Sequence, residues 1–187
     1  ADDALLRGAP EEVGAEEERW RGEQGIQTIP DLIRWSCARY GSAVALRQLT
    51  RNGQRELTYG ELQERVDGLS EYWQGQGLAP GDRVLLYARS GPEWVLAYMA
   101  ASCLGAAVVP VDPQTPADEV WRLAAFVDAR GLMLAATQWE RLRAAAAAAA
   151  DSERLLILDV EHDGARLGAA GSESPVGAPR RLRPPAV

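Results

Sequence analysis

Side chains that could carry covalent or metal chemistry are few in this sequence. One histidine, His162, and two cysteines, Cys37 and Cys103, lie far apart along the chain. A zinc site needs about four nitrogen or sulfur ligands at short spacing, so these residues predict no metal site. All 20 basic residues are arginine, which excludes a Schiff-base lysine, a lysine nucleophile and the lysine of a phosphate-binding P-loop. We expect no catalytic residue in this chain.

The three residues also have ordinary structural explanations. Cys37 and Cys103 lie on predicted apolar helix faces, where a buried and unreactive thiol is the usual state. His162 lies in a glycine-rich stretch and is expected to be an exposed linker residue.

Two glycine-containing turns are the candidates for phosphate binding. Gly75-Gln76-Gly77 follows a predicted helix, whereas a dinucleotide-binding loop follows a strand and opens a helix, so we expect a helix stop. Ser90-Gly91-Pro92-Glu93 does follow a strand and open a helix, which places its amides to receive an anion. The Glu93 carboxylate would repel that anion, and a helix cap would occupy the amides. We therefore expect a cap here and no cofactor-binding residue.

Asp112 is the one acidic candidate at the end of a predicted strand. It follows the run Val108–Val111 and precedes Pro113. The carboxyl edge of a parallel sheet is where ligands bind, but an aspartate before proline is also a common turn former. The turn is the favoured interpretation.

A helix-capping pattern, Ser/Thr-x-x-Asp/Glu, recurs five times. In this pattern the hydroxyl accepts a hydrogen bond from the amide three residues on, while the acid returns to the amide of the capping residue. Each copy is followed by apolar residues at helical spacing, so the pattern predicts five helix starts. The five copies are Thr28–Asp31, Thr58–Glu61, Ser90–Glu93, Thr115–Asp118 and Thr137–Glu140.

Six short apolar runs separate the predicted helices. The last four are nearly continuous rather than alternating, as in parallel strands covered on both faces. They begin at residues 83, 107, 132 and 155, a regular spacing that fits one strand and one crossover helix each time. The runs are Val44–Leu49, Glu56–Tyr59, Arg83–Ala88, Ala107–Val111, Leu132–Ala136 and Leu155–Leu158.

These elements predict an α/β fold. Asn52-Gly53, between the first two runs, is a hairpin signal. We predict a doubly wound, mostly parallel sheet with helices on both faces, preceded by a β-hairpin. Residues 26–160 form this α/β part, residues 1–25 an acidic irregular arm, and residues 161–187 a Gly/Pro/Arg linker-like tail. A linker at the end of the sequence favours a natural polypeptide that continues.

The composition of the chain limits which kinds of partner and which cellular location we expect for the protein. The chain of 187 residues is 47% hydrophobic and 25% charged, which is ordinary for a globular protein. Its net charge of −7 argues against a nucleic-acid binder. No apolar run approaches the roughly 18 residues of a spanning helix, and no secretory signal opens the sequence. We expect no transmembrane segment and a cytoplasmic location.

Four segments resemble, in order and spacing, the N-terminal part of adenylate-forming enzymes. This AMP-binding superfamily includes acyl-CoA synthetases, peptide-synthetase adenylation domains and luciferases. The resemblance covers about residues 26–160 and implies a partial N-terminal domain of the acyl-CoA synthetase-like fold. The four segments are residues 56–62, 81–84, 90–95 and 104–113. The first is similar to a Leu-Thr-Tyr-x-Glu-Leu motif of the family, and the last to a Gly-Ala-x-x-x-Pro-x-Asp/Asn-Pro motif. Residues 28–32 also fit the family's opening helix.

The resemblance implies an activity for the full-length enzyme and none for this segment. Such an enzyme uses ATP and Mg to convert a carboxylic acid into an acyl-adenylate, and passes the acyl group to a thiol such as CoA. The family's phosphate loop ending in Pro-Lys-Gly, its ribose-binding Asp, its Mg-binding Glu and its C-terminal-domain Lys lie downstream of the matched region. Hence no catalytic, cofactor-binding or metal-binding residue is transferred to this sequence.

Segments 90–94 and 110–114 are most similar to fatty acyl-CoA ligases. The chain is therefore interpreted as the N-terminal scaffold segment of an AMP-forming acyl-CoA synthetase. Its expected partners are the remainder of that enzyme and, through it, a carboxylic or fatty acid substrate. An exposed sheet edge is also a route to dimerisation. The alternatives are a segment of a peptide-synthetase-type adenylation domain, and a free-standing, non-catalytic α/β binding or regulatory module.

Overall fold

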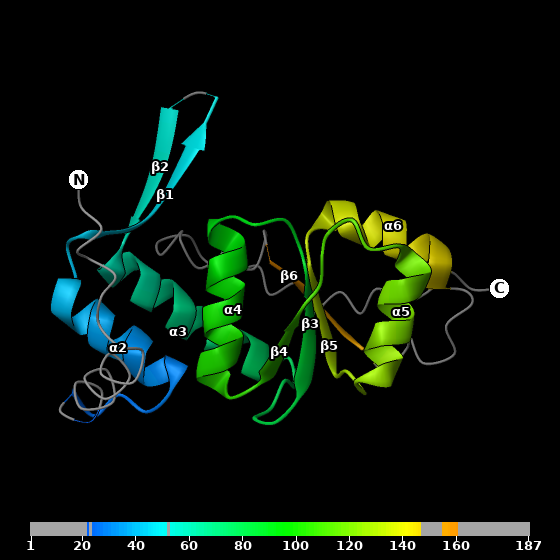
Figure 1. The fold of residues 1–187 in the computed structure, drawn as a ribbon, viewed down its shortest axis with the longest axis horizontal. Coiled ribbons are helices and arrows are strands. Elements are labelled where there is room, and N and C mark those ends of the chain that lie inside the picture. Colours follow the sequence, from blue (N-terminus) through cyan, green and yellow to red (C-terminus); the bar gives the residue numbers. More distant parts are fainter. Residues whose placement is uncertain (1–21, 23, 52, 147–154, 161–187) are drawn as a thin grey trace, which may run out of the picture.

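A computed structural model describes residues 22, 24–51, 53–146 and 155–160 (Figure 1). His162, the predicted tail and most of the predicted acidic arm lie outside these residues. The described chain forms two sheets, one of two strands and one of four. Five described helices of ten or more residues accompany them: α2 (Ile29–Tyr40), α3 (Tyr59–Gly75), α4 (Pro92–Leu104), α5 (Ala117–Phe126) and α6 (Ala136–Ala146).

The four-stranded sheet is parallel throughout, as the continuous apolar runs predict. Its strand order is β4-β3-β5-β6, and Leu85 in the second strand of this order is the register partner of Val109 on one side and of Leu132 on the other. The strands are β3 (Arg83–Tyr87), β4 (Ala107–Pro110), β5 (Gly131–Leu134) and β6 (Leu156–Asp159).

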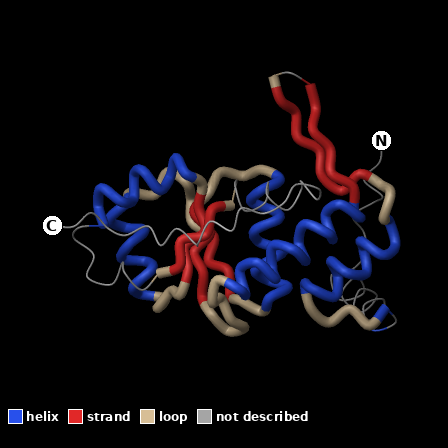
Figure 2. The backbone as a smooth tube through the Cα atoms, turned by 180° about the vertical axis from the view of Figure 1, so that it is seen from behind, coloured by secondary structure: helices blue, strands red, loops and turns tan. Residues whose placement is uncertain are grey.

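Helices cover both faces of this sheet, and two apolar cores result. Val84 and Leu86 of β3 pack into a cluster with α2, α3 and α4, whereas Leu85 and Tyr87 pack into a cluster with α5 and α6. All four side chains are fully buried, which explains why the run shows no alternation of polar and apolar residues. Figure 2 shows the strands between the two groups of helices. The predicted doubly wound α/β architecture is confirmed.

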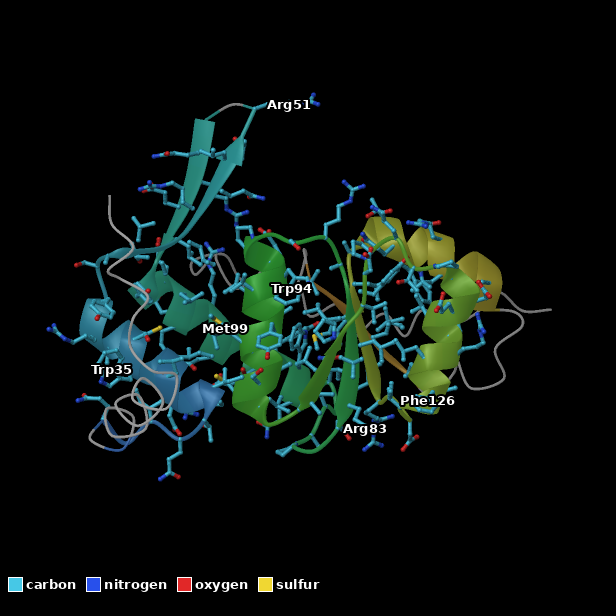
Figure 3. All side chains as sticks on the ribbon, in the orientation of Figure 1. Trp35, Arg51, Arg83, Trp94, Met99 and Phe126 are labelled. Atoms are coloured by element: carbon cyan, nitrogen blue, oxygen red, sulfur yellow. The ribbon has the colours of Figure 1, made fainter. Side chains whose placement is uncertain are left out.

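The predicted hairpin forms the smaller sheet. Strands β1 (Val44–Thr50) and β2 (Gly53–Thr58) pair antiparallel, and Gly53 follows the tip with φ +130°, a conformation that L side chains rarely adopt. The hairpin extends away from the helices and the larger sheet (Figure 1), and Arg51 lies at its far end (Figure 3). An ion pair from Arg55 to Glu93 on α4, 2.5 Å long, ties it to the rest of the molecule.

Two of the five predicted capping boxes form. Thr28 caps α2 with Asp31, and Thr58 caps α3 with Glu61. The Thr28 hydroxyl, and then the Gln27 amide, lower the pKa of Asp31. The Thr58 amide and hydroxyl likewise lower the pKa of Glu61, because each hydrogen bond favours the charged carboxylate.

The other three predicted boxes are wrong, although a helix begins near each. Gly91, not Ser90, is the N-cap of α4, because Glu93 turns to the Arg55 guanidinium instead of returning to the cap. Pro116, predicted as the first helical residue, is itself the N-cap of α5 and leaves Thr115 outside the helix. Helix α6 begins at Ala136, so Thr137 lies inside its first turn and donates to Gln138 Oε1.

Candidate functional site: a cleft at the carboxyl edge of the sheet

The strand order places a switch in chain direction between β3 and β5. From β3 the chain moves outward through α4 to β4, and it then returns through α5 to β5 on the opposite side of β3. Helix α4, which follows β3, packs on one face of the sheet, whereas α6, which follows β5, packs on the other. Because these two helices leave the sheet in opposite directions, the loops before them separate and open a crevice. In α/β sheets this point is where ligands bind.

A cleft of about 440 Å³ lies there. Residues from three successive connections line it, each directly after the carboxyl end of a strand. Because the strands are parallel, these connections meet at one edge of the sheet even though they are far apart in sequence. The lining residues are Arg89 and Ser90 after β3, Pro113 and Gln114 after β4, and Thr137, Gln138 and Arg141 after β5.

Among the described residues, the lining carries two positive charges and no carboxylate. Arg89 makes no ion pair or hydrogen bond with any residue in the described part of the chain. Arg141 reaches the Pro113 carbonyl oxygen through Nη1 at 3.4 Å, which holds the guanidinium beside the β4 connection. At the opposite edge of the sheet, Arg83 is already paired, with its Nη2 2.6 Å from an Asp128 carboxylate oxygen (Figure 3).

Gln138 is the buried polar member of the cleft, with 4% of its surface exposed. Its Oε1 accepts a hydrogen bond from the Thr137 hydroxyl at 2.9 Å, and its backbone amide donates to the Ala135 carbonyl at 3.0 Å. Within residues 22, 24–51, 53–146 and 155–160, the side-chain Nε2 meets no acceptor. Among the described residues, the buried side-chain polar atom that lacks a hydrogen-bond partner is Oε1 of Gln76, and not an atom of Gln138.

Asp112 shapes the loop rather than lining the cleft. Its Oδ1 accepts from the Gln114 amide at 2.7 Å, and its carbonyl accepts from the Thr115 amide at 2.9 Å. The Tyr87 hydroxyl donates to the Thr115 carbonyl at 3.0 Å and fixes the far end of the loop. The predicted turn at Asp112 is confirmed, and its effect is to hold Pro113 and Gln114 at the cleft.

The remaining candidates from the sequence lie away from this edge. Helix α3 ends at Gly75, and Gly77 follows with φ +97°, so the predicted helix stop is confirmed. Cys37 is buried and Cys103 half-buried, both as free thiols. Burial raises the pKa of both thiols, which favours their protonated form.

Sequence reasoning missed Arg89, Gln138 and Arg141. A signal for them was present, because each follows the carboxyl end of an apolar run that was predicted as a parallel strand. What the runs do not show is the order of strands in the sheet. Only the order β4-β3-β5-β6 makes the residues after β3 and β5 neighbours across a crevice.

The sequence profile of the family described as "AMP-binding enzyme" matches residues 33–186. This chain belongs to that family. Relatives include a medium/long-chain-fatty-acid–(acyl-carrier-protein) ligase, FadD10, of Mycobacterium tuberculosis, which is 31% identical over 58% of this chain and 20% of its own length. A long-chain-fatty-acid–CoA ligase of Drosophila melanogaster is 35% identical over 50% of this chain and 14% of its own.

Peptide synthetases are equally similar to this member of the AMP-binding family. A linear gramicidin synthase of Brevibacillus parabrevis is 31% identical over 56% of this chain and 1% of its own length. The chain thus spans a fifth or less of the curated relatives named here.

Solved structures agree with the family and the fold. Klebsiella oxytoca NpsA, in complex with 3-hydroxyanthranilyl-AMSN, matches with a TM-score of 0.53 at 29% identity, over 58% of this chain and 21% of NpsA. The NpsA N-terminal subdomain matches with a TM-score of 0.61 at 23% identity, over 79% of this chain and 33% of the subdomain. The resemblance noted in the sequence, to an N-terminal segment of an adenylate-forming enzyme, is therefore confirmed.

The family implies ATP and Mg in the full enzyme, and the described residues do not fit an ATP–Mg site. The sequence has no lysine to pair with a polyphosphate. The cleft lining has no carboxylate for a magnesium ion, and no three His, Cys, Asp or Glu side chains gather elsewhere in the described residues. No step of adenylation is assigned to these residues. None of the described helices is long and apolar enough to cross a membrane.

Proposed function

We propose that this chain is the N-terminal scaffold segment of an AMP-forming acyl-CoA synthetase. The whole enzyme would join a fatty or other carboxylic acid to CoA, with conversion of ATP to AMP and diphosphate. We extend the proposal to a cytoplasmic location, since ATP and CoA are both available there. The segment's partners in this proposal are the remainder of the enzyme and, through it, the acid substrate.

The family match over residues 33–186 carries this proposal. Fatty-acid ligases are among the relatives, and segments 90–94 and 110–114 are most similar to that class. In this proposal the segment acts as a scaffold and takes no part in the chemistry. A parallel sheet buried on both faces is rigid, and a rigid sheet keeps the connections at its carboxyl edge in fixed positions for the rest of the enzyme.

A peptide-synthetase adenylation domain is the second candidate. The gramicidin synthase relative supports it at the same identity as the mycobacterial ligase. The two candidates differ in the acid that is activated, an amino acid or a fatty acid, and in the acceptor thiol. A free-standing, non-catalytic α/β module is the third candidate, supported by the two apolar cores of the described fold.

The direct experiment is acid-dependent ATP–pyrophosphate exchange. The purified 187-residue chain is assayed with a panel of fatty acids and a panel of amino acids, beside an intact ligase as positive control. We expect no exchange above background with either panel, because the sequence has no lysine to pair with a polyphosphate and the described residues gather no ligands for magnesium. Exchange that saturates with any acid would overturn the scaffold proposal and identify the substrate class.

A further inference from the structure

We propose that the N-terminal segment of this chain, residues 1–21, binds along an exposed apolar stripe of helix α2, with Trp20 as its anchoring side chain. The inference goes beyond the scaffold role proposed above, and it does not depend on which acid the whole enzyme activates. It rests on three features of the described residues: the apolar stripe itself, the path of the chain that leads into α2, and the charges on the two surfaces.

The first feature is the stripe on α2, a helix at the end of the molecule away from α5 and α6 (Figure 1). Ile29, Leu32 and Tyr40 are 47%, 43% and 44% exposed, and at 3.6 residues per turn their spacing places them along one side of the helix. This α2 stripe (Ile29, Leu32 and Tyr40) lies beside the face that buries Ile33 and Cys37 in the core. A contiguous apolar surface of this kind marks a site of contact.

Aromatic rings extend the α2 stripe at the C-terminal end of the helix. The Tyr40 ring meets the Trp35 ring edge to face, with centroids 5.9 Å apart, and the ring of Tyr59 at the start of α3 lies 5.6 Å away. Figure 3 shows Trp35 on α2. Aromatic rings prefer edge-to-face and offset partners, and each buries a large apolar area. This end of the stripe therefore suits a further aromatic side chain.

The second feature is the path of the chain into α2. Gln24 lies beside the helix and not before its start, because its Oε1 accepts a hydrogen bond from the Trp35 indole at 3.1 Å. Ile26, between Gln24 and the N-cap Thr28, is buried. Followed backward from Thr28, the chain thus already runs alongside α2 as far as Trp35, which is in the direction of Tyr40. The residues that precede Gln24 are joined to the rest of the chain next to the stripe.

Trp20 is the large apolar residue nearest to this point in the sequence. Gln24 is helical, and Gly25 follows it with φ +68°, a conformation typical of the residue after a helix end. In a helix, a residue four positions before Gln24 would share its side, and the Gln24 side chain contacts α2. We therefore assign to Trp20 the aromatic position beside Trp35 and Tyr40.

The third feature is charge. Residues 1–21 contain seven acidic and three basic residues. Helix α2 carries two arginines and one acid, Asp31, which is already engaged in the helix cap. Arg34 has a long ion pair to Asp31, 3.6 Å, with its side chain 58% exposed, and Arg39 lies over the Tyr40 ring at 5.7 Å. Opposite charges attract, so this surface favours an acidic segment over a basic one.

The test is hydroxyl-radical footprinting of the full 187-residue chain, with oxidation of single side chains measured by mass spectrometry. In Trp20→Ala we expect the oxidation rates of Leu32 and Tyr40 to rise severalfold, because the variant uncovers the α2 stripe. Leu49 and Phe126, which are 82% and 87% exposed and lie on other elements, are internal references whose rates should not change. Unchanged oxidation of Leu32 and Tyr40 in this variant would overturn the proposal.

Two charge-matched variants separate the stripe from the rest of α2. Leu32→Glu places a carboxylate in the stripe, and Ala38→Glu places one on a different exposed side of the same helix. We expect Leu32→Glu, and not Ala38→Glu, to speed hydrogen exchange of the amides of residues 15–21 about tenfold. Both sites are exposed, and unchanged thermal melting shows that each variant is folded.

Two results of this comparison would also overturn the proposal. The first is an equal effect of the two variants on exchange, which would mean that general charge and not the stripe is responsible. The second is a dimer in light scattering that Leu32→Glu dissociates, since a second copy of the chain would then cover the stripe in place of residues 1–21.

Discussion

At the scale of single residues, side-chain geometry decides which hydroxyls start helices. Thr58 and Thr115 both occur in the capping pattern, but only Thr58 accepts from the amide three residues on, at 3.2 Å from Glu61. Thr115 lies before Pro116, which takes the capping position itself. The same local pattern therefore contributes differently to the free energy of unfolding at the two sites.

This difference predicts unequal costs for the same substitution. Thr58→Ala should lower the free energy of unfolding by about 1 kcal/mol, because it removes a formed N-cap. Thr115→Ala should cost clearly less, since the hydrogen bonds of Thr115 to Asp112 and Tyr87 use its backbone. Urea unfolding followed by circular dichroism measures both. Equal losses in the two variants would contradict the assignment of the caps.

The Glu61 carboxylate predicts a pH dependence of stability. Its pKa is lowered in the folded protein by the Thr58 amide and hydroxyl, relative to 4.5. A lowered folded pKa means that the contribution to stability is fully present above the unfolded value, and is lost as the pH falls through the lower, folded pKa. The stability difference between the natural chain and Glu61→Gln should therefore shrink as the pH falls below about 4.5.

Urea unfolding at neutral pH and in the acid range measures that difference. Glu71→Gln is the control, because it removes an exposed carboxylate further along α3 that takes no part in the helix cap. A Glu61→Gln difference that stays constant across this range would show that the cap does not depend on ionisation.

At the scale of elements, one ion pair joins the projecting hairpin to α4. A two-stranded hairpin is marginally stable by itself, and Leu49 near its end is 82% exposed. Arg55 reaches out of the hairpin to Glu93, while Arg47 pairs with Glu56 inside the hairpin, at 2.6 Å. The two arginines thus have similar ion pairs but different structural roles.

Arg55→Gln should therefore speed hydrogen exchange of the β1 and β2 amides. The pair is partly exposed, with side-chain exposures of 51% and 25%, so global unfolding should change by less than about 1 kcal/mol. Arg47→Gln is the matched control and should leave the hairpin attached to α4. Native-state hydrogen exchange measures the exchange rates of these amides in both variants. Equal exchange in the two would show that Glu93 does not hold the hairpin.

The elements also show what the sequence could and could not predict. Strand β3 was predicted as Arg83–Ala88 and is observed as Arg83–Tyr87, because burial on both faces leaves a continuous apolar run that sequence alone reveals. The capping box at Ser90 failed because Glu93 has a partner 38 residues away, Arg55. Local patterns carry no information about such a partner. The cleft was missed for a related reason. The spacing of apolar residues predicts where strands lie in the sequence, but not their order in the sheet.

At the scale of the whole molecule, the apolar cores that stabilise the fold are separate from the polar cleft at the edge of the sheet. Two apolar cores hold one sheet between two groups of helices. The described residues that line the cleft at its carboxyl edge are polar and basic, with no carboxylate among them. The chain belongs to the family of AMP-binding enzymes, and the role proposed above for it is to position other parts of such an enzyme. Scaffold function of this kind is best tested by supplying those other parts.

The decisive measurement is adenylation by a chimera. Residues 26–160 of this chain replace the matching segment of the mycobacterial fatty-acid ligase, and fatty-acid-dependent ATP–pyrophosphate exchange is measured. We predict exchange well above that of the ligase lacking the segment, and its loss when the chimera carries Leu86→Asp, which places a charge among fully buried side chains. A soluble, folded chimera without exchange would contradict the scaffold role.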